Sequence, residues 1–375
     1  MSKTTSTIQD RLPILSRISN GASVYVLQTF IGGVMLAQKG YQWFYPAAVQ
    51  PSFIKTYECR PDLPIRIFFP KSYDQTSSQN LPTVFVVHGG AFIMGNPWDD
   101  DKLNEQFASM HNILVIELNY HKAPAHPFPT AIYDVEALML AVFDDESLPV
   151  DKSRIAFEGF SAGGNLILGA CQLPSIREKI KPAAAIGIYP VLDQTIKGEE
   201  KCKMRHYKPG LGGGMRGKPE DFLRAWGPMV RWSYVPVGQD LSDPLLSPIL
   251  APREHLPDHI FLLAAELDQL SHESWRMASK LAGRPVPALT DKTGQENIAN
   301  NGNNLILDDE RFAFEHRDGS GKTVQWLLVP DEVHGFDHIP PSWHGSKEAE
   351  ESATYKTTLY QQMVGKWLYN TAWRS

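Results

Sequence analysis

The chain has 375 residues, of which 42% are hydrophobic and 21% charged, a composition typical of a globular domain and unlike that of a disordered segment. Its formal net charge is −6, with acidic and basic residues interspersed, so a nucleic-acid partner is not expected. The three cysteines, Cys59, Cys171 and Cys202, are too few and too scattered for a disulfide framework or a four-thiolate zinc site. A reducing, cytoplasmic location is therefore expected.

The N-terminal region contains one apolar run, residues 22–37, which Gln28 interrupts. The run is shorter than the roughly 20 residues that cross a bilayer. Asp10 and Arg17 precede it and no small-residue cleavage site follows before Tyr41, so it does not fit a secretory signal. We expect a helix that covers a pocket, and no membrane partner. Membrane association is the alternative, and it requires the run to be exposed.

From about residue 52 onward, short β-rich runs alternate with helical stretches, the pattern of a sheet built from βαβ units. Several runs are apolar at consecutive positions, as expected for strands that helices cover on both faces. The predicted strands are 65–69, 83–88, 113–118, 155–157, 184–189, 260–264 and 324–329. The predicted helices are 131–143, 164–172, 273–281 and 353–369. This order predicts a mostly parallel, doubly wound α/β sheet.

Two segments interrupt the alternation. Residues 193–248 are rich in glycine, proline and charge, with a helical stretch near 219–230. Residues 285–322 are polar and rich in asparagine and glycine, which indicates a long insertion. We expect this polar insertion to decorate the surface, with a position at the border of the pocket as the alternative.

The strongest local motif is residues 159–163, Gly-Phe-Ser-Ala-Gly, between a predicted strand and a predicted helix. A Gly-x-Ser-x-Gly at such a turn holds its serine on a tight bend with the hydroxyl exposed. Ser161 is therefore the candidate nucleophile. Residues 88–92, His-Gly-Gly-Ala-Phe, also follow a predicted strand, and backbone amides there could stabilise the oxyanion that forms when a serine attacks a carbonyl.

A serine nucleophile needs a histidine base and a carboxylate that orients it. His334 follows the last predicted strand and precedes the C-terminal helix, which makes it the candidate base. Asp268 lies just after an apolar strand, at the sheet edge where such folds place their sites. Asp331 is the rival acid on the loop of His334. The order Ser161, Asp268, His334 is the order of α/β-hydrolases.

The chain resembles the hormone-sensitive-lipase-like branch of the α/β-hydrolases, which includes bacterial and fungal esterases and arylacetamide deacetylase. The resemblance extends from about residue 82 to 336. It rests on these segments, in the family's order: His-Gly-Gly at 88–90, YHKAPAHPFPTAIYDV at 120–135, GFSAGGNL at 159–166, DPLLSPILAP at 243–252, AAELDQL at 264–270 and HGF at 334–336.

By this resemblance Ser161 would be the nucleophile, His334 the base and Asp268 its partner. The amides of Gly89, Gly90 and Ala162 would form an oxyanion hole, and His88 would brace the loop. Residues 1–50 would be a cap segment on a catalytic domain of residues 51–375, with a second cap segment at about 193–245. Ala91 departs from the third glycine of many members, and Phe160 from their aspartate. Pocket residues expected on this basis are Phe92 and Phe160, with further aromatic candidates at Trp43, Phe44, Phe222, Trp226 and Trp232.

The resulting hypothesis is hydrolysis of a small-molecule carboxylic ester, with a small to medium acyl group, through an acyl-serine intermediate. No cofactor is expected, and no metal, because the histidines lack partners at ligand spacing. A biosynthetic deacylase, acyl transferase or cyclase is the first alternative. A ligand-binding protein without activity is the second, and a lipase acting at membranes the third. The sequence does not determine the oligomeric state, and a homodimer is one possibility.

Overall fold

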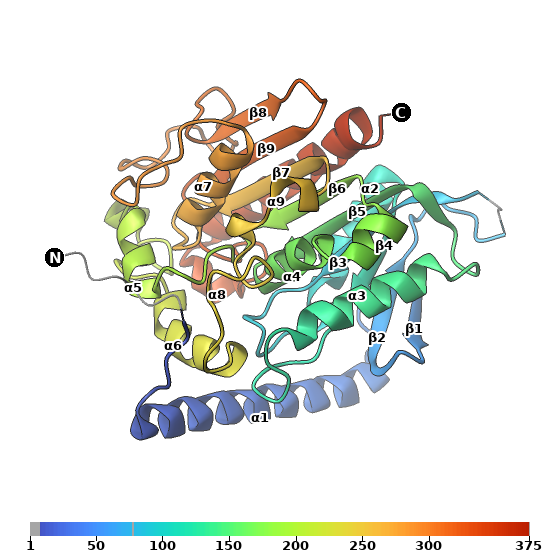
Figure 1. Ribbon diagram of the computed structural model, residues 1–375, viewed down its shortest axis with the longest axis horizontal. Helices are drawn as coiled ribbons and strands as arrows, with labels where there is room; N and C mark the ends of the chain where they lie inside the picture. The colour runs from blue at the N-terminus through green and yellow to red at the C-terminus, as the bar shows by residue number, and fades with distance from the viewer. Residues whose placement is uncertain (1–7, 77–78, 375) are drawn as a thin grey trace.

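The computed structural model describes residues 8–76 and 79–374, and a nine-stranded sheet forms the centre of this part of the chain (Figure 1). The strand order is β1-β2-β4-β3-β5-β6-β7-β9-β8. The neighbours from β4 to β9 pair in parallel. The pairs β1–β2, β2–β4 and β8–β9 are antiparallel. The prediction of a mostly parallel, doubly wound α/β sheet is confirmed.

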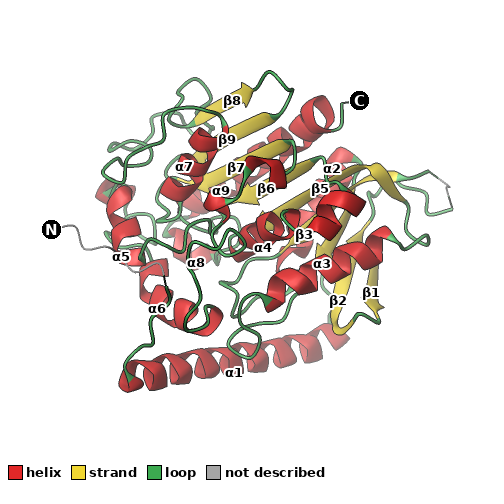
Figure 2. Ribbon diagram, in the orientation of Figure 1, coloured by secondary structure: helices red, strands yellow, loops and turns green. Residues whose placement is uncertain are grey.

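The strands are β1 (Phe53–Tyr57), β2 (Arg60–Phe68), β3 (Leu81–Val87), β4 (Leu114–Leu118), β5 (Val150–Phe160), β6 (Ala184–Ile188), β7 (His259–Ala265), β8 (Ala313–Arg317) and β9 (Thr323–Val329). The α-helices are α1 (Ile14–Phe44), α2 (Asp101–His111), α3 (Thr130–Phe143), α4 (Ala162–Cys171), α5 (Gly198–Lys201), α6 (Leu223–Tyr234), α7 (Ser271–Leu281), α8 (Pro341–His344) and α9 (Lys347–Trp367). Figure 2 shows helices on both sides of the sheet.

Each predicted strand overlaps a strand of the sheet, but β1 and β8 were not predicted. Both are edge strands with several exposed positions, so neither carries the continuous apolar run of a central strand. β8 lies within the predicted polar insertion 285–322, where no strand was predicted. Helix α2 was also missed, because its sequence is mostly polar and buries only one face.

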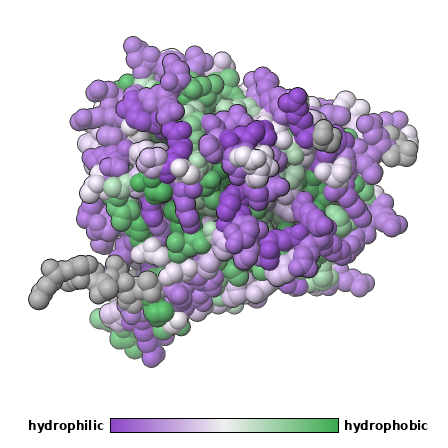
Figure 3. Space-filling model, turned by 45° about the horizontal axis from the view of Figure 1, so that its top comes forward, coloured by the Kyte–Doolittle hydropathy of each residue, from purple (hydrophilic) through white to green (hydrophobic). Residues whose placement is uncertain are grey.

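Helix α1 is about twice as long as the predicted apolar run and lies along one side of the molecule (Figure 1). It packs against α6, where Gly21 lies close to the ring of Trp232. Val24 is its single buried residue. Figure 3 shows hydrophobic side chains at the surface at the lower left, where α1 begins. The run lines a pocket, as expected and as described below, and its outward face is exposed.

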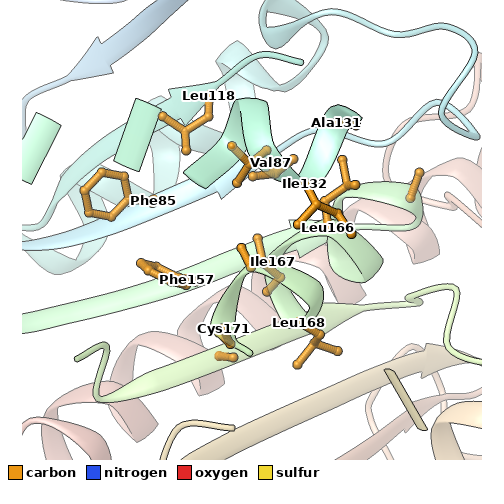
Figure 4. Packing of buried hydrophobic residues seen from close by; sticks show 14 of the residues in the cluster. Phe85, Val87, Leu118, Ala131, Ile132, Phe157, Leu166, Ile167, Leu168 and Cys171 are labelled. Atoms are coloured by element: carbon orange, nitrogen blue, oxygen red, sulfur yellow. The ribbon is translucent and has the colours of Figure 1, made fainter. Parts of the chain in front are cut away.

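Alternate residues of the central strands point into two separate cores, one on each face of the sheet. Phe85 and Val87 of β3 pack with apolar side chains of α3 and α4, as Figure 4 shows. Val84 and Val86 pack instead with residues of α2 and α9. This period of two follows from the pleat of a strand. Helix α4 is buried along its whole length, so the residues at its N-terminus are held rigidly.

Candidate active site

Ser161 lies at the turn between β5 and α4, with a backbone φ of 52° and ψ of −112°. This conformation is strained for a residue other than glycine and turns the hydroxyl away from the helix. The turn also packs directly on the neighbouring strand, because a Cβ atom at Gly163 would lie 1.9 Å from the carbonyl oxygen of Val87. The glycine of the motif is therefore required by this close approach of the backbone.

The structure brings Ser161, His334 and Asp268 into one chain of hydrogen bonds. The Oγ atom of Ser161 lies 2.8 Å from Nε2 of His334. Nδ1 of His334 lies 2.7 Å from Oδ2 of Asp268. The other oxygen of Asp268 accepts a 2.8 Å hydrogen bond from the amide of Leu270. All three side chains are buried, so water competes little with these bonds.

The charge around His334 favours its protonated form. Burial acts to lower its pKa, but the nearby Asp268 carboxylate and the hydrogen bond to it outweigh burial. The pKa of His334 is therefore raised above the ordinary value. A histidine in this setting readily takes a proton from the serine hydroxyl, and the carboxylate stabilises the imidazolium that results.

Asp331, the rival acid, is occupied elsewhere. One of its carboxylate oxygens lies 2.7 Å from Nζ of Lys208, and the other accepts a hydrogen bond from the amide of Ala299. Lys208 also pairs with Glu266, and this ion-pair cluster is almost fully buried. The geometry thus distinguishes the two aspartates that the sequence left in competition.

Two loops present backbone amides beside Ser161. An added Cβ at Gly89 would lie 3.5 Å from Cβ of Ser161, so the glycine loop passes directly against the serine. Gly90 has a φ of +114°, which side chains rarely tolerate. Ala162 is the first residue of α4, and its amide points out of the helix N-terminus. Within the described residues the amides of Gly89, Gly90 and Ala162 have no hydrogen-bond acceptor. They are positioned to receive a negatively charged oxygen.

His88 holds the glycine loop in place. Its Nδ1 lies 2.6 Å from the carbonyl oxygen of Gly89, and its ring stacks on Tyr120 at 4.5 Å between centroids. Burial, with the nearby Lys122, lowers the pKa of His88 well below the ordinary value. A neutral ring then donates from Nδ1 to Gly89 and accepts from Lys122 at Nε2, 3.2 Å away. This bracing role is the one expected from the resemblance.

Two cavities meet at Ser161. We call them lobe A, of about 560 Å³, and lobe B, of about 430 Å³. Both include Ser161 and Trp226. Phe160 lines lobe A and Phe92 lines lobe B.

The further aromatic candidates divide into two groups. Phe222 lines lobe A and Trp232 lobe B. Trp43 and Phe44 line neither lobe and are exposed, so their expected place in the pocket is wrong. The reason is that both lie at the end of α1, beyond the last of its residues that reach lobe A.

Sequence reasoning missed two groups of residues at the site. The first is a set of residues on α1, the helix expected to cover a pocket: Phe30, Ile31 and Met35 line lobe A but were not singled out. The second is His338, which also lines lobe A and contacts both Asp100 and Asp337. The apolar run indicated α1 without its orientation, and no motif distinguished His338.

The part of the chain that the structure describes contains no group of three or more His, Cys, Asp or Glu side chains arranged to hold a metal ion. The polar insertion contributes no residue to either lobe. It contacts the site indirectly, since the amide of Gln295 donates to Glu266, two residues before Asp268.

A parallel sheet flanked by helices, with a serine on the turn after β5, defines the class of α/β-hydrolase-fold proteins. A family model described as the alpha/beta hydrolase fold matches residues 84–297, more than half of the chain. The chain therefore belongs to this family, in its hormone-sensitive-lipase-like branch.

Among curated relatives, an arylesterase of Saccharolobus solfataricus is 31% identical over 231 residues, which cover 61% of this chain and 70% of the relative. An ethyl acetate hydrolase of Pseudomonas putida is 29% identical over 224 residues, which cover 58% of this chain and 65% of the relative. A solved esterase structure from Pyrobaculum calidifontis superimposes with a TM-score of 0.63 at 20% identity, covering 97% of this chain and 99% of that one. At this identity the structural likeness supports the fold.

Proposed function

We propose that this protein is a serine esterase that hydrolyses carboxylic esters with small to medium acyl groups. The observation that carries the proposal is the buried chain of hydrogen bonds from Ser161 through His334 to Asp268, at the meeting point of the two lobes. The names of the relatives, an arylesterase and an ethyl acetate hydrolase, support the same reaction.

The mechanism follows from the positions of these groups. Oγ of Ser161 attacks the ester carbonyl carbon while Nε2 of His334 takes the hydroxyl proton. The amides of Gly89, Gly90 and Ala162 stabilise the oxyanion, each donor contributing ~10²–10³ in rate. The tetrahedral intermediate collapses, the C–O bond to the alcohol breaks, and His334 gives its proton to the leaving oxygen. Water then attacks the acyl-serine by the same route and releases the acid.

Ester substrates suit the two lobes because an ester has two arms on either side of its carbonyl. One lobe would take the acyl group and the other the alcohol. Lobe A is lined mostly by apolar and aromatic side chains, among them Phe160, Phe222 and Trp343, which favours uncharged or aryl groups. Its Asp100 and His338 hydrogen-bond to each other. No specific observation favours a biosynthetic transferase. Ser161, His334 and Asp268 are all present and hydrogen-bonded in a chain, which argues against a binding protein without activity.

We also propose that this protein is located in the cytoplasm. Cys59, Cys171 and Cys202 are all free, the first exposed and the second buried. An exposed free thiol suits a reducing compartment. Fractionation of cells that express the tagged protein tests this proposal. Recovery of the protein from the culture medium would contradict it.

Fluorophosphonate labelling of the wild type and of Ser161→Ala tests the mechanism. The wild type should be labelled and should hydrolyse p-nitrophenyl esters, with the rate depending on acyl length. Ser161→Ala should lose both properties while remaining folded by circular dichroism. Ser233→Ala is a matched control, because its buried hydroxyl bonds to the carbonyl of Met229 and should leave labelling unchanged. Equal labelling of Ser161→Ala and wild type would exclude Ser161 as the nucleophile.

A further inference from the structure

Helix α1 exposes apolar side chains along almost its whole length. It has 31 residues, and among the described part of the chain it is the one helix long and apolar enough to cross a membrane. Large exposed patches of this kind mark surfaces that bind something, because water contacts them unfavourably. The large apolar side chains of α1 that are exposed are Ile14, Leu15, Ile18, Tyr25, Val26, Phe30, Val34, Leu36, Tyr41, Trp43 and Phe44.

The C-terminal end of α1 carries a group of exposed aromatic side chains. Trp43 is 85% exposed, and Phe44, Tyr41 and Tyr45 beside it are also exposed. Tryptophan and tyrosine concentrate at the boundary between lipid and water, where an apolar ring and a polar atom are both satisfied. These residues suit the interfacial region of a bilayer.

The charge of this region is opposite to that of the whole chain. Residues 11–57 contain no aspartate or glutamate, whereas the complete chain has a net charge of −6. Arg11 and Arg17 flank the apolar part of α1 on one side and Lys39 on the other, so no charge falls between residues 18 and 38. A positive, apolar helix on an acidic protein complements an anionic lipid surface.

The inner face of α1 is hydrogen-bonded to the rest of the protein, so α1 cannot cross a membrane in this structure. The side-chain amide of Gln28 donates to the carbonyl oxygens of Ile93 and Ala123, at 2.7 and 2.8 Å. Ile31 and Met35 on this face line lobe A, which also includes Ser161. A helix that crossed the bilayer would have to leave these contacts, whereas a helix lying in the membrane plane keeps them.

We propose that α1 docks this protein onto a phospholipid membrane, lying in the plane of the surface with its outward face among the headgroups and upper acyl chains. This differs from the expectation of no membrane partner, which rested on an apolar run shorter than a membrane span. The helix itself has 31 residues, and its outward face is exposed. Docking in this way places lobe A, which α1 lines, next to the bilayer. The binding itself does not depend on the proposed ester hydrolysis.

Sedimentation of the purified full chain with vesicles of phosphatidylcholine and phosphatidylserine tests the proposal. The wild type should sediment with the vesicles. The double variant Val26→Glu with Leu36→Glu should bind about tenfold more weakly or worse, because two carboxylates oppose both insertion and the anionic surface. Val26 and Leu36 are 68% and 73% exposed and line neither lobe.

The matched control is the double variant Val237→Glu with Leu307→Glu, at positions 65% and 58% exposed outside α1. It adds the same charge and should bind like the wild type. Hydrolysis of soluble p-nitrophenyl acetate should be unchanged in both double variants, which shows that they are folded. Equal binding of the two double variants, or a wild type that stays in the supernatant, would overturn the proposal.

Two further outcomes would also overturn it. Analytical ultracentrifugation that finds a wild-type dimer and a monomeric α1 variant would assign the apolar face to a second copy of the chain. Single cysteines at Arg11 and Gln50, exposed positions outside the two ends of α1, report the orientation on sealed vesicles. The background carries Cys59→Ser and Cys202→Ser, and the remaining Cys171 is buried. A membrane-impermeant maleimide should label both cysteines from outside, and labelling of one end alone would indicate a spanning helix.

Discussion

The Asp268 carboxylate sets how strongly His334 holds a proton, and this gives a pH prediction at the scale of single residues. His334 must be neutral to accept the serine proton, so kcat/KM should rise as pH increases through its pKa. Because that pKa is raised by Asp268, the midpoint should lie above the ordinary histidine value of about 6.5. Asp268→Asn should lower kcat by ~10⁴ and move the midpoint to lower pH. Steady-state kinetics across pH measure both effects.

Asp331→Asn is the control for this prediction. Asp331 bonds to Lys208 and not to His334, so its loss should reduce stability and leave the midpoint in place. A shift of the midpoint in Asp331→Asn, with none in Asp268→Asn, would reverse the assignment of the acid.

At the scale of elements, two buried ion pairs of Lys208 connect the segment 193–245 to the loops that carry the site. Nζ of Lys208 lies 2.8 Å from Glu266, at the end of β7, and 2.7 Å from Asp331, on the loop after β9. Lys208→Met would leave two buried carboxylates without their cation. We expect a loss of about 3–5 kcal/mol in the free energy of unfolding, measured by urea denaturation.

Lys203→Met is the matched control, since Lys203 makes an exposed pair with Glu200 in the same segment. Exposed pairs contribute about 0–1 kcal/mol, so this variant should unfold almost like the wild type. Equal losses in the two variants would show that the buried pairs do not fasten the segment.

The strands and helices also differ in how well their sequence patterns predict them. The central strands were predictable because burial on both faces requires continuous apolar runs. Strands β1 and β8 were not, because they lie at the sheet edges and pair on one side only. Helix α2 was missed for a similar reason, since its buried apolar residues, Leu103, Phe107 and Ala108, are few among polar neighbours.

At the scale of the whole molecule, α1 connects the N-terminal region to the glycine loop through Gln28. The side chain bonds to the carbonyl of Ile93, three residues after Gly90, and to that of Ala123. Gln28→Leu leaves both carbonyls without this donor, at a cost of about 1–3 kcal/mol. Trypsin should then cleave at Arg17 and Lys39 about tenfold faster in the absence of lipid, and kcat should fall.

Gln42→Leu provides the comparison, because the side chain of Gln42 makes no hydrogen bond within the described residues. Its cleavage rate should match that of the wild type. If Gln28→Leu were cleaved no faster than Gln42→Leu, the two hydrogen bonds would not hold α1 on the body.

The sequence by itself determined the α/β sheet, the turn that carries Ser161 and the order of the three polar residues, because each is written in local patterns of periodicity and turn glycines. Tertiary structure decided between Asp268 and Asp331, since both follow a strand and only their distances to His334 differ. It also decided which face of α1 meets the pocket and which remains open. An apolar run shows only that contact of its side chains with water is unfavourable. Which groups cover those side chains depends on the residues that lie near them in the folded structure.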